Sequence, residues 1–191
     1  MNLADRLTLF RIILAPVFFA VYFLPLPLPT VWMVVLLWVI SIVAELTDMF
    51  DGMAARRLNQ SSDFGKLFDP FADTLMQLTA FLCFVIQGIL PPALFLLIIY
   101  REFGILLVRN LMLLKGATMG ARISGKIKTV AYIIAGAVTL LYVSFLRLGI
   151  AESLHAMLHI TAIAVFSASV LISVTSFIDY INVYRKQQIC R

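Results

Sequence analysis

Residues 48–73 read DMFDGMAARRLNQSSDFGKLFDPFAD, and apolar runs long enough to cross a membrane flank this stretch on both sides. Besides Asp63, the stretch holds four aspartates in two close pairs, Asp48 with Asp51 and Asp69 with Asp73. A carboxylate at or near a lipid bilayer is costly unless something neutralises its charge. Nearby protein cations cannot serve all four, so the stretch predicts one or two bound divalent metal ions.

The composition is typical of an integral membrane protein. Of the 191 residues, 62% are hydrophobic and 13% are charged, with a mean hydropathy of +1.02, whereas about 45–50% apolar residues is usual in soluble proteins. Apolar runs predict membrane-crossing helices at residues 7–24, 31–50, 67–89, 93–114, 127–146 and 154–180. We therefore expect an all-α integral membrane protein, a bundle of six transmembrane helices that forms a single domain over residues 1–191.

Basic residues mark alternate connections between the expected helices. They occur near the N-terminus, in the segments 54–66 and 115–128, and in the C-terminal tail, whereas the turns at 25–29 and 88–92 carry no charge. The positive-inside rule then places both termini and both basic segments in the cytoplasm. The net charge of +5 is explained by anionic lipid, and no nucleic-acid partner is expected. We expect a multi-pass protein of the inner (cytoplasmic) membrane whose active site faces the cytoplasm.

The spacing of the aspartates predicts one shared site. Asp48 and Asp51 are three residues apart and Asp69 and Asp73 are four apart, so each pair lies on one face of a helix. The two helices run in opposite directions from one basic segment, so we expect the pairs to face each other at similar depth. Such an all-oxygen site suits Mg²⁺ or Mn²⁺, and two ions there would bridge a pyrophosphate.

Glycines and an arginine accompany the aspartates. Gly52 and Gly65 would let a nucleotide approach the backbone closely, and Arg56, one turn beyond Gly52, is placed to pair with a phosphate. The simpler alternative is an ordinary charged loop between two helices. That alternative does not explain Asp48 or Asp73, which lie within apolar runs.

The order of these residues resembles a known pattern. Asp48 is followed, after two residues, by Asp51-Gly52, then after two by Ala55-Arg56, after eight by Gly65, after three by Asp69 and after three by Asp73. This order resembles the complete signature of the CDP-alcohol phosphotransferase family, with every fixed position and gap matched. The resemblance implies an enzyme that cleaves the pyrophosphate of a CDP-linked donor, transfers a substituted phosphoryl group to an alcohol and releases CMP.

The resemblance also implies roles for individual residues. The four aspartates would hold the metal ions, and Asp73 would also take the proton of the acceptor hydroxyl as general base. The cradle for cytidine diphosphate would consist of Gly52, Ala55, Arg56 and Gly65. Negative charge develops on phosphate oxygens and on the leaving CMP in such a reaction, and metal ions with Arg56 are suited to stabilise it. A homodimer is implied by the resemblance alone.

Further charges interrupt the later apolar runs. On a helix Glu102 and Arg109 fall on nearly one stripe, with Arg101 beside it, and this face is expected to point away from lipid. Lys126 and Lys128 stand at the start of the fifth run. These cations indicate a pocket for an anionic acceptor. The alternatives are a buried Arg101–Glu102 pair that fixes helix packing and lysines that act as positive-inside anchors.

The segments 101–109 and 125–129, together with Asn2 and the stretch 7–11, resemble one branch of the family. Its acceptor is sn-glycerol 3-phosphate and its donor is CDP-diacylglycerol, whose acyl chains would stay in the membrane lipid. The resemblance assigns the phosphate of the acceptor to Arg101, Arg109, Lys126 and Lys128. There are two departures, because Thr74 stands where a lysine is expected in that branch and Asp5 where an asparagine is common.

Other functions stay open. Thr74 is next to Asp73, which leaves a relative that transfers phosphocholine or phosphoethanolamine from a CDP-alcohol to diacylglycerol, or another CDP-alcohol phosphotransferase. An uncharged acceptor would need fewer cations, which favours glycerol 3-phosphate. A cation transporter is a more remote alternative, and Arg56 would repel its cargo.

His155 and His159 have a spacing that zinc ligands use, but interfacial histidines far from the aspartates are expected instead.

Overall fold

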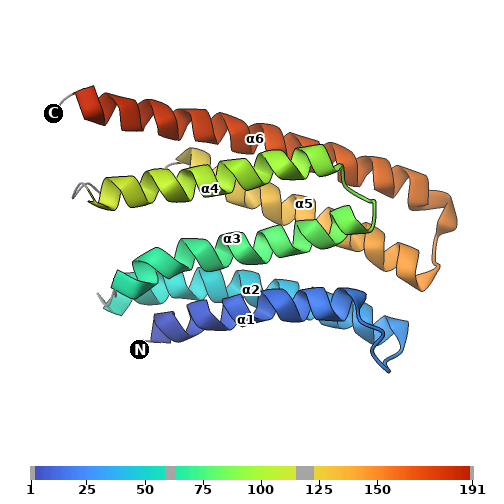
Figure 1. Ribbon diagram of the computed structural model, residues 1–191. Helices are drawn as coiled ribbons and strands as arrows, with labels where there is room; N and C mark the ends of the chain where they lie inside the picture. The colour runs from blue at the N-terminus through green and yellow to red at the C-terminus, as the bar shows by residue number, and fades with distance from the viewer. Residues whose placement is uncertain (1–2, 59–62, 115–122, 190–191) are drawn as a thin grey trace. The chain divides into compact units, whose positions relative to one another are not determined.

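A computed structural model describes residues 3–58, 63–114 and 123–189, and side chains for residues 6–48, 68, 70–112, 123–182 and 185. Within this part of the chain the secondary structure is helical, with six α-helices, one short 3-10 helix and no strand (Figure 1). The elements are α1 (Leu3–Phe23), α2 (Thr30–Leu58), α3 (Asp63–Ile86), α4 (Pro92–Leu114), α5 (Ile123–Leu148), η1 (Glu152–Leu154) and α6 (His155–Ile189). The prediction of an all-α protein is confirmed for these residues.

The turn between α1 and α2 follows from its prolines. Proline has no N–H to continue a helical ladder, and short bonds replace that ladder, from Leu26 N to Leu24 O at 2.8 Å and from Leu28 N to Leu26 O at 2.7 Å. Pro29 then precedes the first residue of α2, and its carbonyl accepts from Trp32 N at 2.9 Å. The prolines therefore end one helix and begin the next.

The prediction of a basic loop over residues 54–66 is wrong for most of its length. Helix α2 continues to Leu58 and α3 begins at Asp63. Apolar runs mark the part of a helix that fits in a membrane, not the point where the helix ends. The residues after Gly52 include alanines, arginines and a leucine, which are strong helix formers, and the single glycine costs only about 1 kcal/mol. Helix α6 likewise continues past the end predicted at residue 180, to Ile189.

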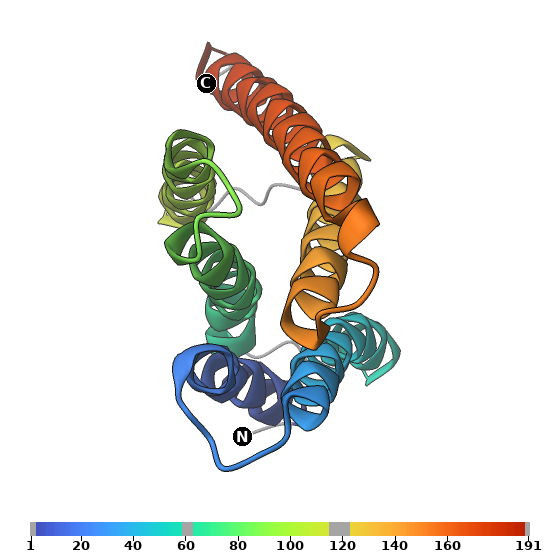
Figure 2. The same ribbon diagram turned by 90° about the vertical axis from the view of Figure 1, so that its right-hand side faces the viewer.

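The described chain divides into two compact units. The first comprises Met1–Cys83 and Val143–Glu152. In it α1 and α2 pack side by side in opposite directions (Figure 1 and Figure 2). The most buried apolar side chains of this unit, each at most 2% exposed, are Ala15, Phe18, Leu37, Ala72, Phe81, Cys83 and Val143.

The second unit comprises Phe84–Tyr142 and Ser153–Arg191. Here α4 packs along α6 (Figure 1 and Figure 2). The two helices approach closely at Gly104, where an added Cβ would lie 2.7 Å from Cζ of Phe177. Among the most buried side chains of this unit are Ile98, Tyr132, Ala135, Ala162 and Phe166.

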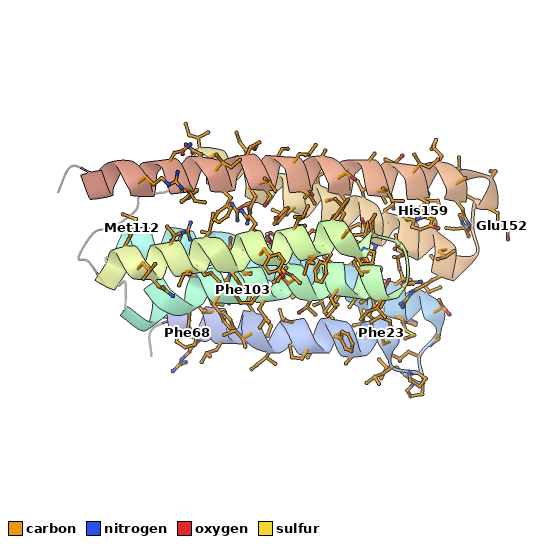
Figure 3. All side chains as sticks on the ribbon, turned by 45° about the horizontal axis from the view of Figure 1, so that its top comes forward. Phe23, Phe68, Phe103, Met112, Glu152 and His159 are labelled. Carbon is orange, nitrogen blue, oxygen red and sulfur yellow. The ribbon has the colours of Figure 1, made fainter. Side chains whose placement is uncertain are left out.

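The outward-facing side chains are those of a membrane protein. Side chains project outward along the helices (Figure 3). Many of the exposed ones are large and apolar, and Tyr100, Phe103 and Leu171 are 68%, 53% and 68% exposed. Within the described residues, four stretches are long and apolar enough to cross a membrane, namely Arg6–Phe23, Thr30–Asp48, Ile123–Leu148 and Glu152–Asn182. The segment Pro70–Ile86 is a shorter apolar helix. The chain is therefore a candidate multi-pass membrane protein.

Hydroxyl groups within these helices bond to their own backbone. Thr47 Oγ1, Thr139 Oγ1 and Ser167 Oγ donate to the carbonyl oxygen four residues earlier, at 2.5, 2.7 and 2.7 Å. A polar group buried in hydrocarbon must find a partner, and the preceding turn supplies one. Polar residues in the apolar runs are thus compatible with spanning helices.

We predict that Arg147→Met destabilises the first unit. Arg147 Nη2 donates to Tyr22 O at 2.7 Å, and its Cζ lies 4.3 Å from the centre of the Tyr22 ring, so one side chain joins the end of α5 to the end of α1. Loss of both contacts should lower the free energy of unfolding by about 1–3 kcal/mol. Thermal unfolding of the purified protein in detergent measures this change. The control Arg185→Met, at an exposed position of α6, should leave the midpoint unchanged, and equal midpoints for both variants would refute the prediction.

Candidate active site

The helices carry the four aspartates as their spacing requires. Residues 48 and 51 both lie in α2, and residues 69 and 73 both lie in α3. Helical spacing therefore applies to both pairs, as the sequence predicts. Of Asp51, Gly52, Ala55, Arg56, Gly65 and Asp69, only the helical backbone is described, and their side-chain contacts lie outside the described part of the chain.

Asp48 is held by a buried arginine from α1. Arg11 Nη1 donates to Asp48 Oδ1 at 2.7 Å, and Arg11 is 1% exposed whereas the side chain of Asp48 is 39% exposed. The arginine compensates the carboxylate from the interior while the carboxylate stays accessible from outside. In the sequence, Arg11 appears as a positive charge near the N-terminus and as part of the stretch 7–11, and no partner is predicted for it. Its place inside the apolar run 7–24 is the signal that would have revealed it, because a charge there needs a partner.

Asp73 lies half-buried on α3, in the same unit. Its Oδ1 accepts a hydrogen bond from Gln77 Nε2 at 3.3 Å, one helical turn later. The neighbouring Thr74, which departs from the pattern expected in the branch, is 6% exposed. A half-buried carboxylate with a neutral hydrogen-bond donor is suited to accept a proton from a bound hydroxyl group.

The donor set of the signature fits a hard divalent cation. It consists of carboxylates without histidine or cysteine, which is the chemistry that Mg²⁺ and Mn²⁺ prefer, and Asp48 is accessible enough to reach an ion. Among the side chains that the structure describes, no three His, Cys, Asp or Glu gather closely enough to hold a metal ion. Asp51 and Asp69 lie outside the described side chains.

A second group of charges lies inside the second unit. Glu102 Oε1 accepts from Arg101 Nη1 at 2.7 Å and from Lys128 Nζ at 3.2 Å. The three side chains are only 4%, 6% and 7% exposed for Arg101, Glu102 and Lys128. The polar face of α4 points inward here, as expected, since Phe103 beside it is 53% exposed (Figure 3). Two cations share one carboxylate, so the cluster carries one excess positive charge.

The other two predicted acceptor residues lie outside this cluster. Arg109 is partly exposed, and its Nη2 lies 3.4 Å from the hydroxyl oxygen of Tyr180 on α6. Lys126 is exposed on the first turns of α5. The structure therefore brings Arg101 and Lys128 together through Glu102, and it links the two arginines to residues of α6 that the sequence does not single out.

The histidines of α6 pack against an aromatic ring. The ring of His159 stacks on Tyr142 with centroids 5.2 Å apart, and His155 meets the same ring edge-on at 6.4 Å. His159 Nε2 also lies 3.2 Å from Ile89 O. Both histidines thus have packing partners within the second unit, and their place at a membrane interface stays a prediction.

The comparison with known proteins decides the family. The family model for CDP-alcohol phosphatidyltransferase matches residues 1–168. The chain belongs to this family. It is thus a transferase, and the resemblance seen in the signature is confirmed. Members of the CDP-alcohol phosphatidyltransferase family generally depend on divalent metal ions.

Relatives from several bacteria cover most of the chain. A Treponema pallidum protein named CDP-diacylglycerol–glycerol-3-phosphate 3-phosphatidyltransferase is 33% identical over 198 residues, which cover 96% of this chain and 89% of the relative. A probable phosphatidylglycerophosphate synthase of Mycobacterium tuberculosis is 32% identical, with coverage of 94% and 80%. A Bacillus subtilis protein with the same name as the Treponema protein is 34% identical, with coverage of 74% and 77%.

We predict that Glu102→Gln destabilises the protein. The substitution removes the one negative charge of the cluster and leaves two buried cations, and breaking a buried ion pair in this way costs about 3–5 kcal/mol. The thermal unfolding midpoint should fall, and it should partly recover in Glu102→Gln/Lys128→Met, which also removes one of the cations. Glu152→Gln, at an exposed position, is the control. A midpoint for Glu102→Gln equal to that of the control would contradict the prediction.

Proposed function

We propose that the protein transfers the phosphatidyl group of CDP-diacylglycerol to sn-glycerol 3-phosphate, which yields phosphatidylglycerophosphate and CMP. The observation that supports this most is the similarity to a protein of that name over 96% of the chain. The excess of cations in the second unit supports an acceptor with a phosphate. Phosphatidyl transfer of this kind is a step of phospholipid synthesis.

The reaction exchanges one phosphorus–oxygen bond for another. A hydroxyl oxygen of the acceptor forms a bond to the phosphorus that carries diacylglycerol. The bond from this phosphorus to the bridging oxygen of the pyrophosphate breaks, and CMP leaves with the electron pair. We assign Asp73 as the general base that takes the hydroxyl proton, because its carboxylate is half-buried and accepts a hydrogen bond from the neutral amide of Gln77.

The first unit supplies the groups for the CDP end of the donor. We assign Asp48, Asp51, Asp69 and Asp73 as ligands of two Mg²⁺ or Mn²⁺ ions, and Gly52, Ala55, Arg56 and Gly65 as the cradle of the cytidine diphosphate. Bound divalent ions would neutralise the pyrophosphate and the charge that develops on it. Arg11 fixes the orientation of Asp48 through the bond to Oδ1.

The second unit supplies the cations for the acceptor. We assign the phosphate of glycerol 3-phosphate to Arg101, Arg109, Lys126 and Lys128. A phosphate dianion would offset the excess positive charge of the buried cluster. The ion pair with Glu102 does not preclude this role, because a guanidinium and an ammonium group each carry more N–H donors than their described bonds use.

We further propose six membrane spans, with both termini and the active site on the cytoplasmic side of the inner membrane. Helix α4 falls outside the four apolar stretches because it carries Arg101, Glu102 and Arg109. Two of these are buried and paired within the second unit, so their charge is not exposed to lipid. The chain is proposed to work as a homodimer, as the family resemblance implies.

A transfer assay tests the function. Purified protein is mixed with CDP-diacylglycerol and Mg²⁺ or Mn²⁺, and glycerol 3-phosphate, inositol, inositol phosphate or serine is added separately. We expect CMP release and a new phospholipid with glycerol 3-phosphate alone, and no reaction in the presence of a chelator. The lipid product is identified by mass spectrometry. If CDP-choline and diacylglycerol react while all of these acceptors fail, the protein is the alternative phosphotransferase.

We predict that substitutions of Asp73 and Asp48 have different effects. Asp73→Asn should abolish turnover because the amide cannot take the hydroxyl proton, while binding of the CDP donor is largely kept. Asp48→Asn should weaken donor binding more, because it removes a proposed metal ligand and also the carboxylate that pairs with the buried Arg11. Binding of a non-reacting CDP analogue by calorimetry, beside single-turnover rates, distinguishes the variants. Equal loss of binding and turnover in both would remove the separate role of Asp73.

A further inference from the structure

Helix α6 carries a buried polar stripe that the assigned residues do not include. Ser169, Ser173, Ser176 and Tyr180 follow one another at intervals of four, three and four residues, which places them on one helical face. They are 1%, 0%, 2% and 2% exposed. A buried polar group in an apolar helix needs a partner, so the partners of this stripe show what it does.

The side chains of Ser176 and Tyr180 bond to the arginines of α4, and Ser173 does so through its carbonyl oxygen, while the Ser173 hydroxyl bonds to the hydroxyl of Tyr132. Arg101 Nε donates to Ser173 O at 3.2 Å, and Arg101 Nη2 donates to Ser176 Oγ at 3.3 Å. Arg109 Nη2 donates to the Tyr180 hydroxyl oxygen at 3.4 Å, and its Cζ lies 5.7 Å from the centre of that ring. The fourth residue, Ser169, bonds within its own helix, to Phe166 O at 2.7 Å. The stripe thus holds both arginines of α4.

These bonds fix the plane of the Arg101 guanidinium. Nε, Nη1 and Nη2 are bonded to Ser173, Glu102 and Ser176, on two helices. A planar guanidinium group that is hydrogen-bonded at all three nitrogens has little rotational freedom, and its remaining N–H groups point in fixed directions. Such preorganisation lowers the entropy cost of binding an anion.

Tyr180 also meets the start of α5. A Cβ added to Gly125 would lie 3.1 Å from the Tyr180 hydroxyl oxygen, so a glycine here leaves room for the phenol. One residue earlier, Ser124 Oγ donates to Asp179 Oδ2 at 2.8 Å. Tyr180 therefore lies where Arg109 of α4 and the turn of α5 that precedes Lys126 meet α6.

We propose that Ser176 and Tyr180 are positioning residues of the acceptor-phosphate site, and that they act by orienting Arg101 and Arg109. This inference rests on the proposed function, because it takes these arginines as ligands of the acceptor's phosphate. The two residues of α6 do not themselves touch the phosphate. A role in packing alone would change stability without changing how well one particular substrate binds.

Steady-state kinetics with both substrates tests the proposal. Ser176→Ala and Tyr180→Phe each delete one acceptor of an arginine hydrogen bond and keep the helix and the ring. We expect each to raise the KM for glycerol 3-phosphate by about tenfold, which corresponds to about 1.4 kcal/mol, with kcat and the KM for CDP-diacylglycerol changed less than about twofold. Ser169→Ala is the matched control on the same buried face, and its KM values should equal those of the wild type.

A double-mutant cycle tests whether Tyr180 affects the KM for glycerol 3-phosphate through Arg109. Arg109→Ala should raise the KM for glycerol 3-phosphate more than Tyr180→Phe does. If Tyr180 acts through Arg109, adding Tyr180→Phe to Arg109→Ala should raise the KM no further. Additive effects would show that Tyr180 acts by another route and would overturn its assignment as a positioning residue for Arg109.

The outcomes separate this inference from the proposed function. If the wild type does not use glycerol 3-phosphate, the proposed function fails. If the wild type uses it and Ser176→Ala and Tyr180→Phe keep the wild-type KM, only the inference fails, whatever happens to their unfolding midpoints. An equal rise in the KM for both substrates would likewise overturn it, because it would indicate a general distortion of the enzyme.

Discussion

Compensation of buried charge in apolar helices is the constraint on which this structure depends. Each unit meets it with ion pairs of buried cations. In the first, Arg11 of α1 pairs with Asp48 of α2, and in the second, Glu102 pairs with its neighbour Arg101 on α4 and with Lys128 of α5. An unpaired charge at these depths would be far more costly than any single apolar contact is favourable. The paired charges therefore lie on the inward faces of α1, α4 and α5, together with buried apolar side chains such as Phe18, Ile98 and Ala135.

The two sets of charges differ in a way that suits two ends of a transfer reaction. In the first unit the described pair is neutral, and its carboxylate is 39% exposed, so the acidic group can meet cations from water. In the second unit the carboxylate is buried and outnumbered by cations, so the group carries an excess of positive charge. A phosphatidyltransferase needs both kinds of site, because metal ions serve the pyrophosphate of its donor and cations serve a charged acceptor.

The sequence predicts features that depend on composition and short spacing. The membrane class, the helices and the aspartate pairs follow from apolar runs and from intervals of three and four residues. The end of α2 does not, because hydropathy falls at residue 50 while helix propensity stays high up to Leu58. The contacts of α6 also cannot be predicted from the sequence, since Ser176 and Arg101 are 75 residues apart. A serine or tyrosine in an apolar run does not indicate that it has a distant partner. A charged residue in such a run, such as Arg11, does indicate one.

The composition of the buried cluster in the second unit supports the proposed binding of a phosphate. Well-packed apolar residues of similar volume stabilise a protein interior as well as a buried ion pair or better. Packing therefore gives no reason to place two cations and one carboxylate among α4 and α5, or to commit Ser173 and Ser176 of α6 to Arg101. An oriented excess of positive charge has a clear use when the ligand is a phosphate. Glu102 then stabilises the protein by compensating part of the charge of Arg101 and Lys128, which allows both cations to be buried.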